Sequence, residues 1–379
     1  MSSKPKIALM TYAVDNRPAK GTAIVARKWT EALIAAQDQF DLTFVHYEKC
    51  DDPIYHHGVK EVIFPEFKWK FFNRRSLRQV YYFLTTKDRY DIVQWFQPRL
   101  YPFFWRAPAD HIVVAVHGAG DIGKANAFNV MRHVFNWTVI LFRKHIAIAT
   151  AGSQYAAQDI IKKYKFDPAQ VRIIHYGAEE SFEPATSAEV DAVKKKYNLP
   201  EKFFLNIARL NPGKNAYPTI RAFDRFARTH PEADVHFVNV GDKGTDRPLI
   251  DAFIRASPVR ERIHLVGYIE TQDLPALYSA ALALVFPLIG EGFGLPVMEG
   301  MRCGTPMVIA ETSYPEVQHD EAVLVDAWSE DSIAKGMETI YNDPELRVSM
   351  ARKGLERAKH FTWKESGEKL IAAYKELML

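Results

Sequence analysis

The chain has 379 residues, of which 47% are hydrophobic and 25% are charged. This composition is typical of a folded soluble protein, and the length exceeds that of one ordinary core, so we expect two α/β domains of similar size. The only cysteines, Cys50 and Cys303, give neither a disulfide framework nor a zinc-binding spacing, which favours a reducing cytoplasm.

The net charge of +3 conceals a difference between the two halves. Residues 1–178 carry 25 Lys and Arg against 15 Asp and Glu, a net +10, and the remainder carries a net −7. A basic half predicts an anionic partner such as a lipid headgroup, a phosphorylated acceptor or nucleic acid, although clustered charge is more often solvated surface. The first apolar stretch, Ile7–Val14, is too short for a signal-peptide core, and no run approaches a membrane span.

Short apolar runs alternate with helical segments through the first half, which is the pattern of a parallel sheet with helices on both faces. The expected strands are Lys6–Tyr12, Asp41–His46, Gly58–Phe64, Asp91–Trp95, Ile112–His117, Ile146–Ala151 and Val171–Tyr176. A loop with Lys20 and Gly21 joins the first strand to a helix from about Ala23 to Ala36. Gly21 stands alone where a dinucleotide fingerprint needs three spaced glycines, so a Rossmann dehydrogenase is not expected.

The segment Phe67–Leu84 mixes aromatic and basic residues. These are Lys68, Lys70, Arg74, Arg75 and Arg78 beside Trp69, Phe71 and Phe72. The mixture is typical of a surface that settles on an anionic membrane, or of an amphipathic helix that buries its aromatic side and exposes its basic side. Such segments also bind single-stranded nucleic acid, but nothing else in the chain supports that interpretation.

The sequence GAGDIGK at Gly118–Lys124 has the glycine and lysine spacing of a phosphate-binding P-loop. Ala125 follows where that motif needs a Ser or Thr hydroxyl for magnesium, so we do not expect an NTPase. His117 ends its strand, where open α/β sheets place ligand contacts, although a lone histidine is more often structural.

A linker, Gly177–Thr186, precedes a charged helix, Ser187–Tyr197, and a second alternating series. Its strands are Phe203–Ala208, Val235–Val240, Ile263–Gly267, Ala281–Phe286 and Met307–Ala310. We place the domain boundary at residue 180, with a first domain of residues 1–180 and a second of residues 181–362. After the first strand of the second domain, Arg209 and Lys214 can flank a diphosphate; the alternative is two exposed charges on a turn.

The stretch Ala281–Thr305, ALALVFPLIGEGFGLPVMEGMRCGT, predicts a strand, a glycine-rich loop and a short helix. The start of such a helix offers free backbone N–H groups and a positive dipole end, where phosphate groups bind. Glu291 lies in the loop and Glu299 in the helix. Glutamates near a helix start can also serve only to offset the dipole.

These motifs together resemble the retaining glycosyltransferases of family 4. The resemblance covers most of residues 203–365 and rests on Arg209, Lys214-Asn215, Gly267, Tyr278, Glu291-Gly-Phe-Gly-Leu-Pro-Val-Met-Glu299, Gly304-Thr-Pro and Phe361-Thr-Trp363. The first half matches more loosely, through Gly21, His117-Gly118 and Ser153. It departs from the family pattern at Gly21, which lacks a second glycine, and at Tyr176-Gly177-Ala178, where the family often has Asn-Gly and an acid.

The resemblance implies the GT-B architecture, an α/β fold with two Rossmann-like domains facing a cleft and a final helix, residues 363–379, that returns to the first domain. It implies that Arg209 and Lys214 neutralise the donor diphosphate and that Glu299 accepts hydrogen bonds from the ribose hydroxyls. Glu291 meets the donor sugar near C3 or C4, and His117 reaches the sugar or phosphate. The remaining implied site residues are Gly292, Phe293, Gly294, Leu295 and Tyr268 for the donor, and Gly21 and Lys20 for the acceptor.

The expected function is transfer of a sugar from a nucleotide-sugar donor to a glycan or lipid-linked acceptor, with retention of configuration. Neither a metal nor a cofactor is expected, because no paired-aspartate metal motif lies in a suitable loop. We expect a cytoplasmic enzyme that is peripheral on the inner face of the membrane and binds no nucleic acid. A glycan phosphorylase or nucleotide-sugar epimerase on the same fold, and a non-catalytic two-domain binding protein, remain as alternatives.

Overall fold

The computed structural model describes residues 4–14, 21–68, 74–97, 103–117, 130–288, 290, 293–314, 316–317 and 320–379. The chain divides into two compact units. The first unit is Met1–Tyr176 with Trp363–Leu379, and the second unit is Gly177–Thr362. The boundary therefore lies four residues before the one expected from the sequence, and the C-terminal helix belongs to the first unit.

The described part of the first unit contains a sheet of seven strands, all parallel. In spatial order the strands are β3 (Lys60–Ile63), β2 (Asp41–His46), β1 (Lys6–Met10), β4 (Tyr90–Trp95), β5 (Ala109–Ala115), β6 (Ile146–Ala151) and β7 (Val171–Ile173). The uniformly apolar runs of the sequence are the buried central strands, because both faces of such a sheet are covered by helices. The order of strands reverses between β1 and β4.

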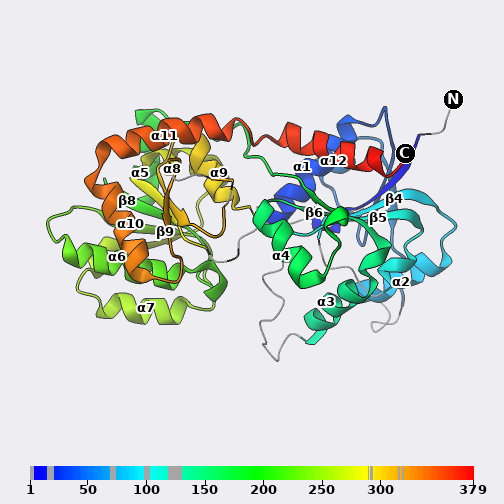
Figure 1. Cartoon of the computed structure of the whole chain (residues 1–379), viewed down its shortest axis with the longest axis horizontal. Helices are drawn as coiled ribbons and strands as arrows, with labels where there is room; N and C mark the ends of the chain where they lie inside the picture. The colour runs from blue at the N-terminus through cyan, green and yellow to red at the C-terminus, as the bar shows by residue number, and fades with distance from the viewer. Residues whose placement is uncertain are drawn as a thin grey trace. The chain divides into compact units, whose positions relative to one another are not determined.

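The helices of the first unit are α1 (Gly21–Ala35), α2 (Arg75–Thr85), α3 (Val130–Phe142), α4 (Gln154–Tyr164) and α12 (Trp363–Glu376). Helix α12, at the end of the chain, packs beside α1, near its beginning (Figure 1). The indole Nε1 of Trp29 donates to Oγ of Ser366 at 2.8 Å. A Cβ atom at Gly367 would lie 2.5 Å from Cβ of Ala32, so glycine is what allows the two helices to approach so closely.

The described part of the second unit contains a sheet of six parallel strands. The order is β10 (Ile263–Gly267), β9 (His236–Val240), β8 (Phe203–Ile207), β11 (Ala283–Phe286), β12 (Met307–Ala310) and β13 (Val323–Val325). Its helices are α5 (Ser187–Tyr197), α6 (Ala216–Thr229), α7 (Arg247–Ala256), α8 (Leu274–Ala280), α9 (Leu295–Arg302), α10 (Glu330–Asn342) and α11 (Pro344–Ala358). The aromatic side chains of Phe204, Phe223 and Phe226 form part of its core.

The structure confirms the expected α/β class with two Rossmann-like units, and corrects several details. The first strand ends at Met10 and continues as a 3₁₀ turn, Thr11–Ala13. Strand β7 ends at Ile173 rather than at Tyr176. Strand β13, a three-residue edge strand, was not predicted because it is too short to show a pattern.

One basic residue of the basic and aromatic segment lies in the interior rather than on the surface. Arg78 is only 3% exposed, and its guanidinium donates to the carbonyl oxygens of Tyr47, Phe64 and Pro65 at 2.6–2.9 Å. The charge is buried because these three backbone acceptors satisfy it, so Arg78 is a structural residue. Residues 69–73 of this segment, and the GAGDIGK sequence at 118–124, lie outside the described residues.

Candidate functional site: the carboxyl edge of the second sheet

The strand order of the second unit reverses between β8 and β11, which pair in parallel. In open α/β sheets, ligands bind outside the carboxyl ends of the strands at such a reversal. The loop after β8 carries Arg209 and Lys214, and the loop after β11 leads to Glu299. The pairing of β8 with β11 therefore places these two loops on neighbouring strands.

Asn215 holds the two loops together. It is 5% exposed and has a left-handed backbone with φ 52°, directly before α6. Its Nδ2 donates to the carbonyl oxygens of Pro287, after β11, and Ala327, after β13, at 2.8 Å each. One buried side chain therefore fixes the loop after β8 against the loops that follow two other strands.

The two predicted cations occupy this loop. Lys214 ends a 3₁₀ turn, Pro212–Lys214, and is partly buried. Arg209 has a half-exposed side chain whose Nε lies 3.9 Å from Oδ2 of Asp242, in the loop after β9. At that exposure and distance the ion pair contributes little to stability, which leaves the guanidinium available for an anionic ligand.

The glycine-rich loop is described in part. Glu291 and Gly292 lie outside the described residues, so the structure does not place the predicted sugar contact. Gly294 has φ +70° and precedes α9, and a Cβ atom there would lie 2.4 Å from Cε1 of Tyr314. Both facts require glycine at this position. Phe293 is 4% exposed and packs edge-on against Phe361, so its ring belongs to the core, and Leu295 begins α9.

Glu299, in α9, receives a hydrogen bond at 2.7 Å from the hydroxyl of Tyr278, in α8, to its Oε2 atom. Burial raises the pKa of Glu299 to about 7; the hydrogen bond from Tyr278 lowers the pKa, and the charge of Glu179 raises it. The carboxyl group therefore changes its charge near neutral pH. Tyr278 belongs to the family pattern, but its contact with Glu299 was not predicted. Nothing in the sequence indicates that these two residues, on different helices, lie side by side.

Tyr268 and His117 follow other strands. Tyr268 follows β10, two strands away from β8, and is 63% exposed. His117 follows β5 in the first unit, where its Nε2 lies 2.8 Å from the carbonyl oxygen of Phe96 and its Nδ1 lies 2.8 Å from the hydroxyl of Tyr176. A carbonyl oxygen only accepts, so Nε2 carries the proton and Nδ1 accepts from Tyr176. Burial lowers the pKa of His117, which favours the neutral ring.

The expected acceptor residues are placed only in part. Gly21 begins α1, and Lys20 lies outside the described residues. No group of three or more His, Cys, Asp or Glu side chains arranged to hold a metal ion occurs in the part of the chain that the structure describes. None of the described helices is both long and apolar enough to cross a membrane.

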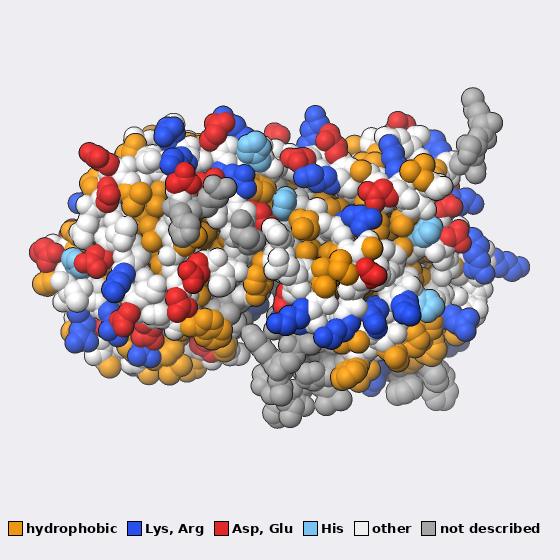
Figure 2. Space-filling model, in the orientation of Figure 1, with side chains coloured by type: hydrophobic (Ala, Val, Ile, Leu, Met, Phe, Trp, Pro, Cys, Tyr) orange, Lys and Arg blue, Asp and Glu red, His pale blue; other side chains and the backbone are white. Residues whose placement is uncertain are grey.

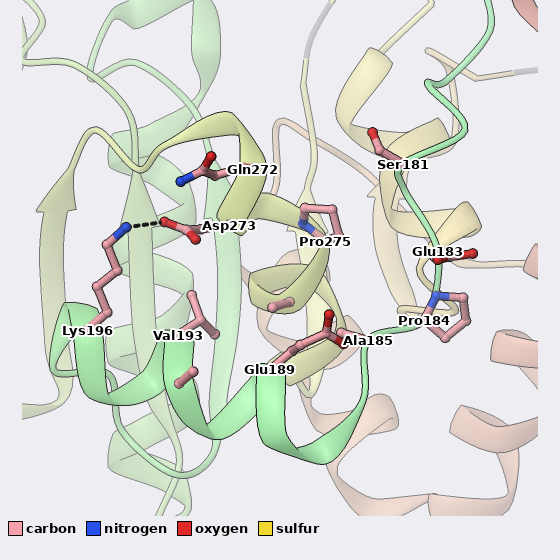
Figure 3. Close-up of a pocket in the computed structure, with 12 residues that line it drawn as sticks. Ser181, Glu183, Pro184, Ala185, Glu189, Val193, Lys196, Gln272, Asp273 and Pro275 are labelled. Atoms are coloured by element: carbon pink, nitrogen blue, oxygen red, sulfur yellow. Dashed lines mark hydrogen bonds and ion pairs between the residues drawn. The ribbon is translucent and has the colours of Figure 1, made fainter.

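A pocket of about 420 Å³ lies elsewhere in the second unit, between the segment 181–185, α5 and the start of α8. Figure 3 shows the ion pair between Lys196 and Asp273 on its wall, with Nζ and Oδ2 2.7 Å apart. Lys196 also pairs with Glu270. Lys196 and Asp273 neutralise each other, and none of the predicted site residues lines the pocket.

Most of the second unit matches the model of a known protein family. Residues 188–357 match the family model of glycosyl transferases group 1. The chain is 28% identical over 227 residues to the O-antigen chain mannosyltransferase B of Escherichia coli, covering 59% of each chain. It is 24% identical over 238 residues to the D-inositol 3-phosphate glycosyltransferase of Corynebacterium glutamicum (strain R), covering 60% of this chain and 57% of that protein. The matched region thus spans less than two thirds of these relatives.

Solved structures match the whole fold. HepE of Anabaena, solved in complex with UDP and glucose, superposes with a TM-score of 0.76 at 14% identity, covering 98% of this chain and 100% of that one. Sucrose-phosphate synthase of Thermosynechococcus elongatus gives a TM-score of 0.76 at 18% identity, covering 99% of both chains. Two parallel sheets with these neighbours constitute the GT-B fold. Residues 188–357 of the second unit are thus similar to the glycosyl transferases group 1.

Proposed function

We propose that this protein transfers a sugar from a nucleotide-sugar donor to a glycan or lipid-linked acceptor, with retention of configuration and without a metal ion. One observation carries the proposal. Two cations, Arg209 and Lys214, and a partly buried carboxyl group, Glu299, follow the neighbouring strands β8 and β11 at the point where the strand order reverses. This arrangement suits a ligand with a diphosphate at one end and sugar hydroxyls at the other.

The chemistry of the leaving group fits these residues. Transfer breaks the bond between the anomeric carbon of the sugar and an oxygen of the diphosphate, so negative charge develops on that oxygen. Arg209 and Lys214 stabilise this charge, together with the backbone N–H groups at the start of α9. Positive charge aimed at the leaving group is the task that a divalent metal performs in other transferases, and here two side chains perform it.

The other predicted residues take the roles that the family resemblance implies. Glu299 accepts hydrogen bonds from the ribose hydroxyls, and Glu291 contacts the donor sugar near C3 or C4. His117 supplies a polar contact to the sugar or phosphate. Retention of configuration is proposed from the resemblance to the retaining family, and nuclear magnetic resonance of the product anomer tests it.

The donor is a nucleoside diphosphate hexose in this proposal. Support comes from HepE, which was solved in complexes that contain UDP, UDP with glucose, and UDP-glucose. A thermal-shift screen with UDP-, GDP- and ADP-sugars tests the donor, because a ligand that binds only the folded state raises the melting temperature. Transfer to an acceptor is then measured against release of free sugar and against exchange with inorganic phosphate. Failure of every nucleotide sugar to stabilise the protein would overturn the proposed function.

We also propose that the first unit contacts an anionic membrane that carries the acceptor. Val134, Trp137 and Leu141 are 45%, 70% and 71% exposed on α3, and their spacing of three and four residues places them on one helix face. Figure 2 shows Lys and Arg side chains next to hydrophobic ones in the region of the first unit where Figure 1 draws α3. On an anionic membrane, the apolar side chains can enter the acyl region while the basic side chains contact the anionic headgroups.

Vesicle co-sedimentation tests this surface. We expect binding to vesicles with anionic lipid at low salt, little binding to zwitterionic vesicles, and weaker binding after Trp137→Ser. Trp328→Ser is the matched control, because Trp328 is an equally exposed tryptophan (79%) in the second unit. Equal binding by both variants would contradict a role for α3.

A further inference from the structure

Tyr278 and Glu299 form an isolated hydrogen-bonded pair. The hydroxyl of Tyr278 donates to Oε2 of Glu299 at 2.7 Å, and within the described part of the chain this is the hydrogen bond that the Glu299 carboxyl group makes. The ring of Tyr278 is fully buried, whereas Glu299 is partly exposed. One carboxyl oxygen is therefore held from inside the unit, and the other remains to meet a ligand.

The position of the tyrosine is fixed by its surroundings. Its backbone carbonyl accepts a hydrogen bond from Oγ1 of Thr305 at 2.9 Å. The ring of Phe182 packs on it edge to face, with centroids 6.0 Å apart. A Cβ atom added at Gly300, in α9, would lie 3.7 Å from the Tyr278 ring. The ring therefore packs directly against the helix that carries Glu299. A hydroxyl locked in this way orients the group that it bonds.

Of the ionisable groups Tyr278, Cys303 and Glu299, only Glu299 has a pKa near neutral pH. Burial, followed by the charge of Glu299, raises the pKa of Tyr278 well above its ordinary value, so its hydroxyl keeps its proton. Burial raises the pKa of the Cys303 thiol, at the end of α9, to about 12. Glu179, in the segment before α5, contributes a negative charge that disfavours the Glu299 carboxylate. The Tyr278 hydroxyl is thus a permanent donor facing a carboxyl group that changes its charge.

We propose that Tyr278 is a positioning residue of the donor site, which holds the ionised carboxylate of Glu299 so that Oε1 accepts the ribose hydroxyls. This inference rests on the proposed function, because it takes Glu299 as the ribose contact. A protonated carboxyl group is a poorer acceptor for two hydroxyl donors, so nucleotide binding strengthens as the pH rises through the pKa of Glu299. Loss of the Tyr278 hydroxyl removes a bond to the carboxylate, which raises the pKa of Glu299 and moves this rise in affinity to higher pH.

The test is calorimetric binding of UDP, with GDP and ADP in parallel, between pH 5.5 and 8.5. We expect Tyr278→Phe to weaken binding about tenfold at pH 7, the scale of one hydrogen bond to a charged group, and to move the midpoint of the pH profile upward. Tyr197→Phe is the matched control, since its hydroxyl donates to the Asp273 carboxylate at 2.6 Å in the same unit without contact to Glu299. Glu299→Gln should bind the nucleotide weakly. Its binding should vary with pH only through titration of the nucleotide phosphate, which affects the wild type and all variants alike.

A second measurement separates this inference from the proposed function. Carbon NMR of labelled glutamate in the protein without nucleotide follows the titration of the Glu299 carboxyl group, assigned by its absence in Glu299→Gln. A higher pKa in Tyr278→Phe than in the wild type supports the inference, and an unchanged pKa overturns it even where no nucleotide binds. If the wild type binds nucleotide and Tyr278→Phe has the same affinity and the same pH midpoint, the positioning role is wrong and the donor site stands.

Discussion

The hydroxyl of Tyr176 donates to Nδ1 of His117 at 2.8 Å, and the other ring nitrogen of His117 donates to the carbonyl oxygen of Phe96 at the same distance. Tyr176 is the last residue of the first unit before the chain enters the second, and its ring stacks on Trp363, where the chain returns. The orientation of His117 is therefore set by a residue at the point where the chain leaves its unit.

We predict that Tyr176→Phe lowers the rate of sugar transfer while nucleotide binding by the second unit is unchanged. The substitution keeps the ring stacked on Trp363 but removes the hydroxyl that donates to Nδ1 of His117 and helps to orient its ring. The loss of one hydrogen bond should cost about 0.5–1.5 kcal/mol in unfolding free energy, which denaturant titration measures. Nitrogen NMR of the histidine rings should show a changed Nδ1 shift for His117 in the variant, because Nδ1 loses its donor, while Nε2 keeps its proton through the bond to Phe96. An unchanged Nδ1 shift would contradict the hydrogen bond from Tyr176.

The same pair has a pH dependence with a defined sign. Burial lowers the pKa of His117 below its ordinary value of 6.5, so the unfolded chain binds a proton at this residue more readily than the folded chain. The contribution of a neutral His117 to stability is therefore complete above about pH 6.5 and is lost as the pH falls toward its folded pKa. We expect His117→Asn to reduce the acid sensitivity of the unfolding free energy between pH 7 and 5. An identical slope in wild type and variant would show that His117 is not buried in its neutral form.

Lys214→Ala should abolish nucleotide-dependent thermal stabilisation and lower transfer by about 10²–10³, the usual effect of removing one group that stabilises charge in a transition state. Lys335→Ala is the control, because Lys335 is exposed on α10 of the same unit. The melting temperature without ligand should be nearly the same in both variants. Full transfer activity in Lys214→Ala would remove the residue from the donor site.

The two loops at the carboxyl edge of the second sheet could be predicted from the sequence because each follows a short apolar strand, and parallel strands end at a shared edge. The pattern of strand, glycine loop and helix at Ala281–Thr305 is visible in the order of residue types alone. It places Glu299 in α9 and Gly294 before it, as the structure has them. The positions of these two loops therefore follow from short stretches of sequence around each strand.

Contacts between distant segments could not be predicted in the same way. Arg78 looked like surface charge because its neighbours are basic, yet its three carbonyl acceptors belong to other segments that only the folded sheet brings to it. The bond between Tyr278 and Glu299 joins two helices separated by a strand and a loop. Neither partner differs by type or spacing from an ordinary core tyrosine or surface glutamate.

Asn215 allows a prediction about the framework of the site. Asn215→Ala leaves the carbonyl oxygens of Pro287 and Ala327 without the Nδ2 donor. It also places alanine in the left-handed backbone region, at φ 52°, which alanine adopts less readily than asparagine. We expect a loss of about 2–4 kcal/mol in unfolding free energy. Asn215→Gly removes the same hydrogen bonds but tolerates the backbone, so it should be less destabilising than Ala. If the two variants were equally stable, backbone strain would play no part at this position.

Glu299→Gln should stabilise the free protein while it weakens nucleotide binding. The pKa of Glu299 is raised from 4.5 to about 7 chiefly by burial, so the folded protein holds a proton that the unfolded chain releases at lower pH. The cost of burying the carboxylate is absent below about pH 4.5, grows between pH 4.5 and 7 and is complete above pH 7. Each pKa unit corresponds to about 1.4 kcal/mol, so the variant should exceed the wild type by about 2–3 kcal/mol at pH 8 and by little at pH 5. Denaturant unfolding of both proteins at the two pH values measures the difference. A stability gain that does not change with pH would mean that packing of the amide, rather than loss of a buried charge, accounts for it.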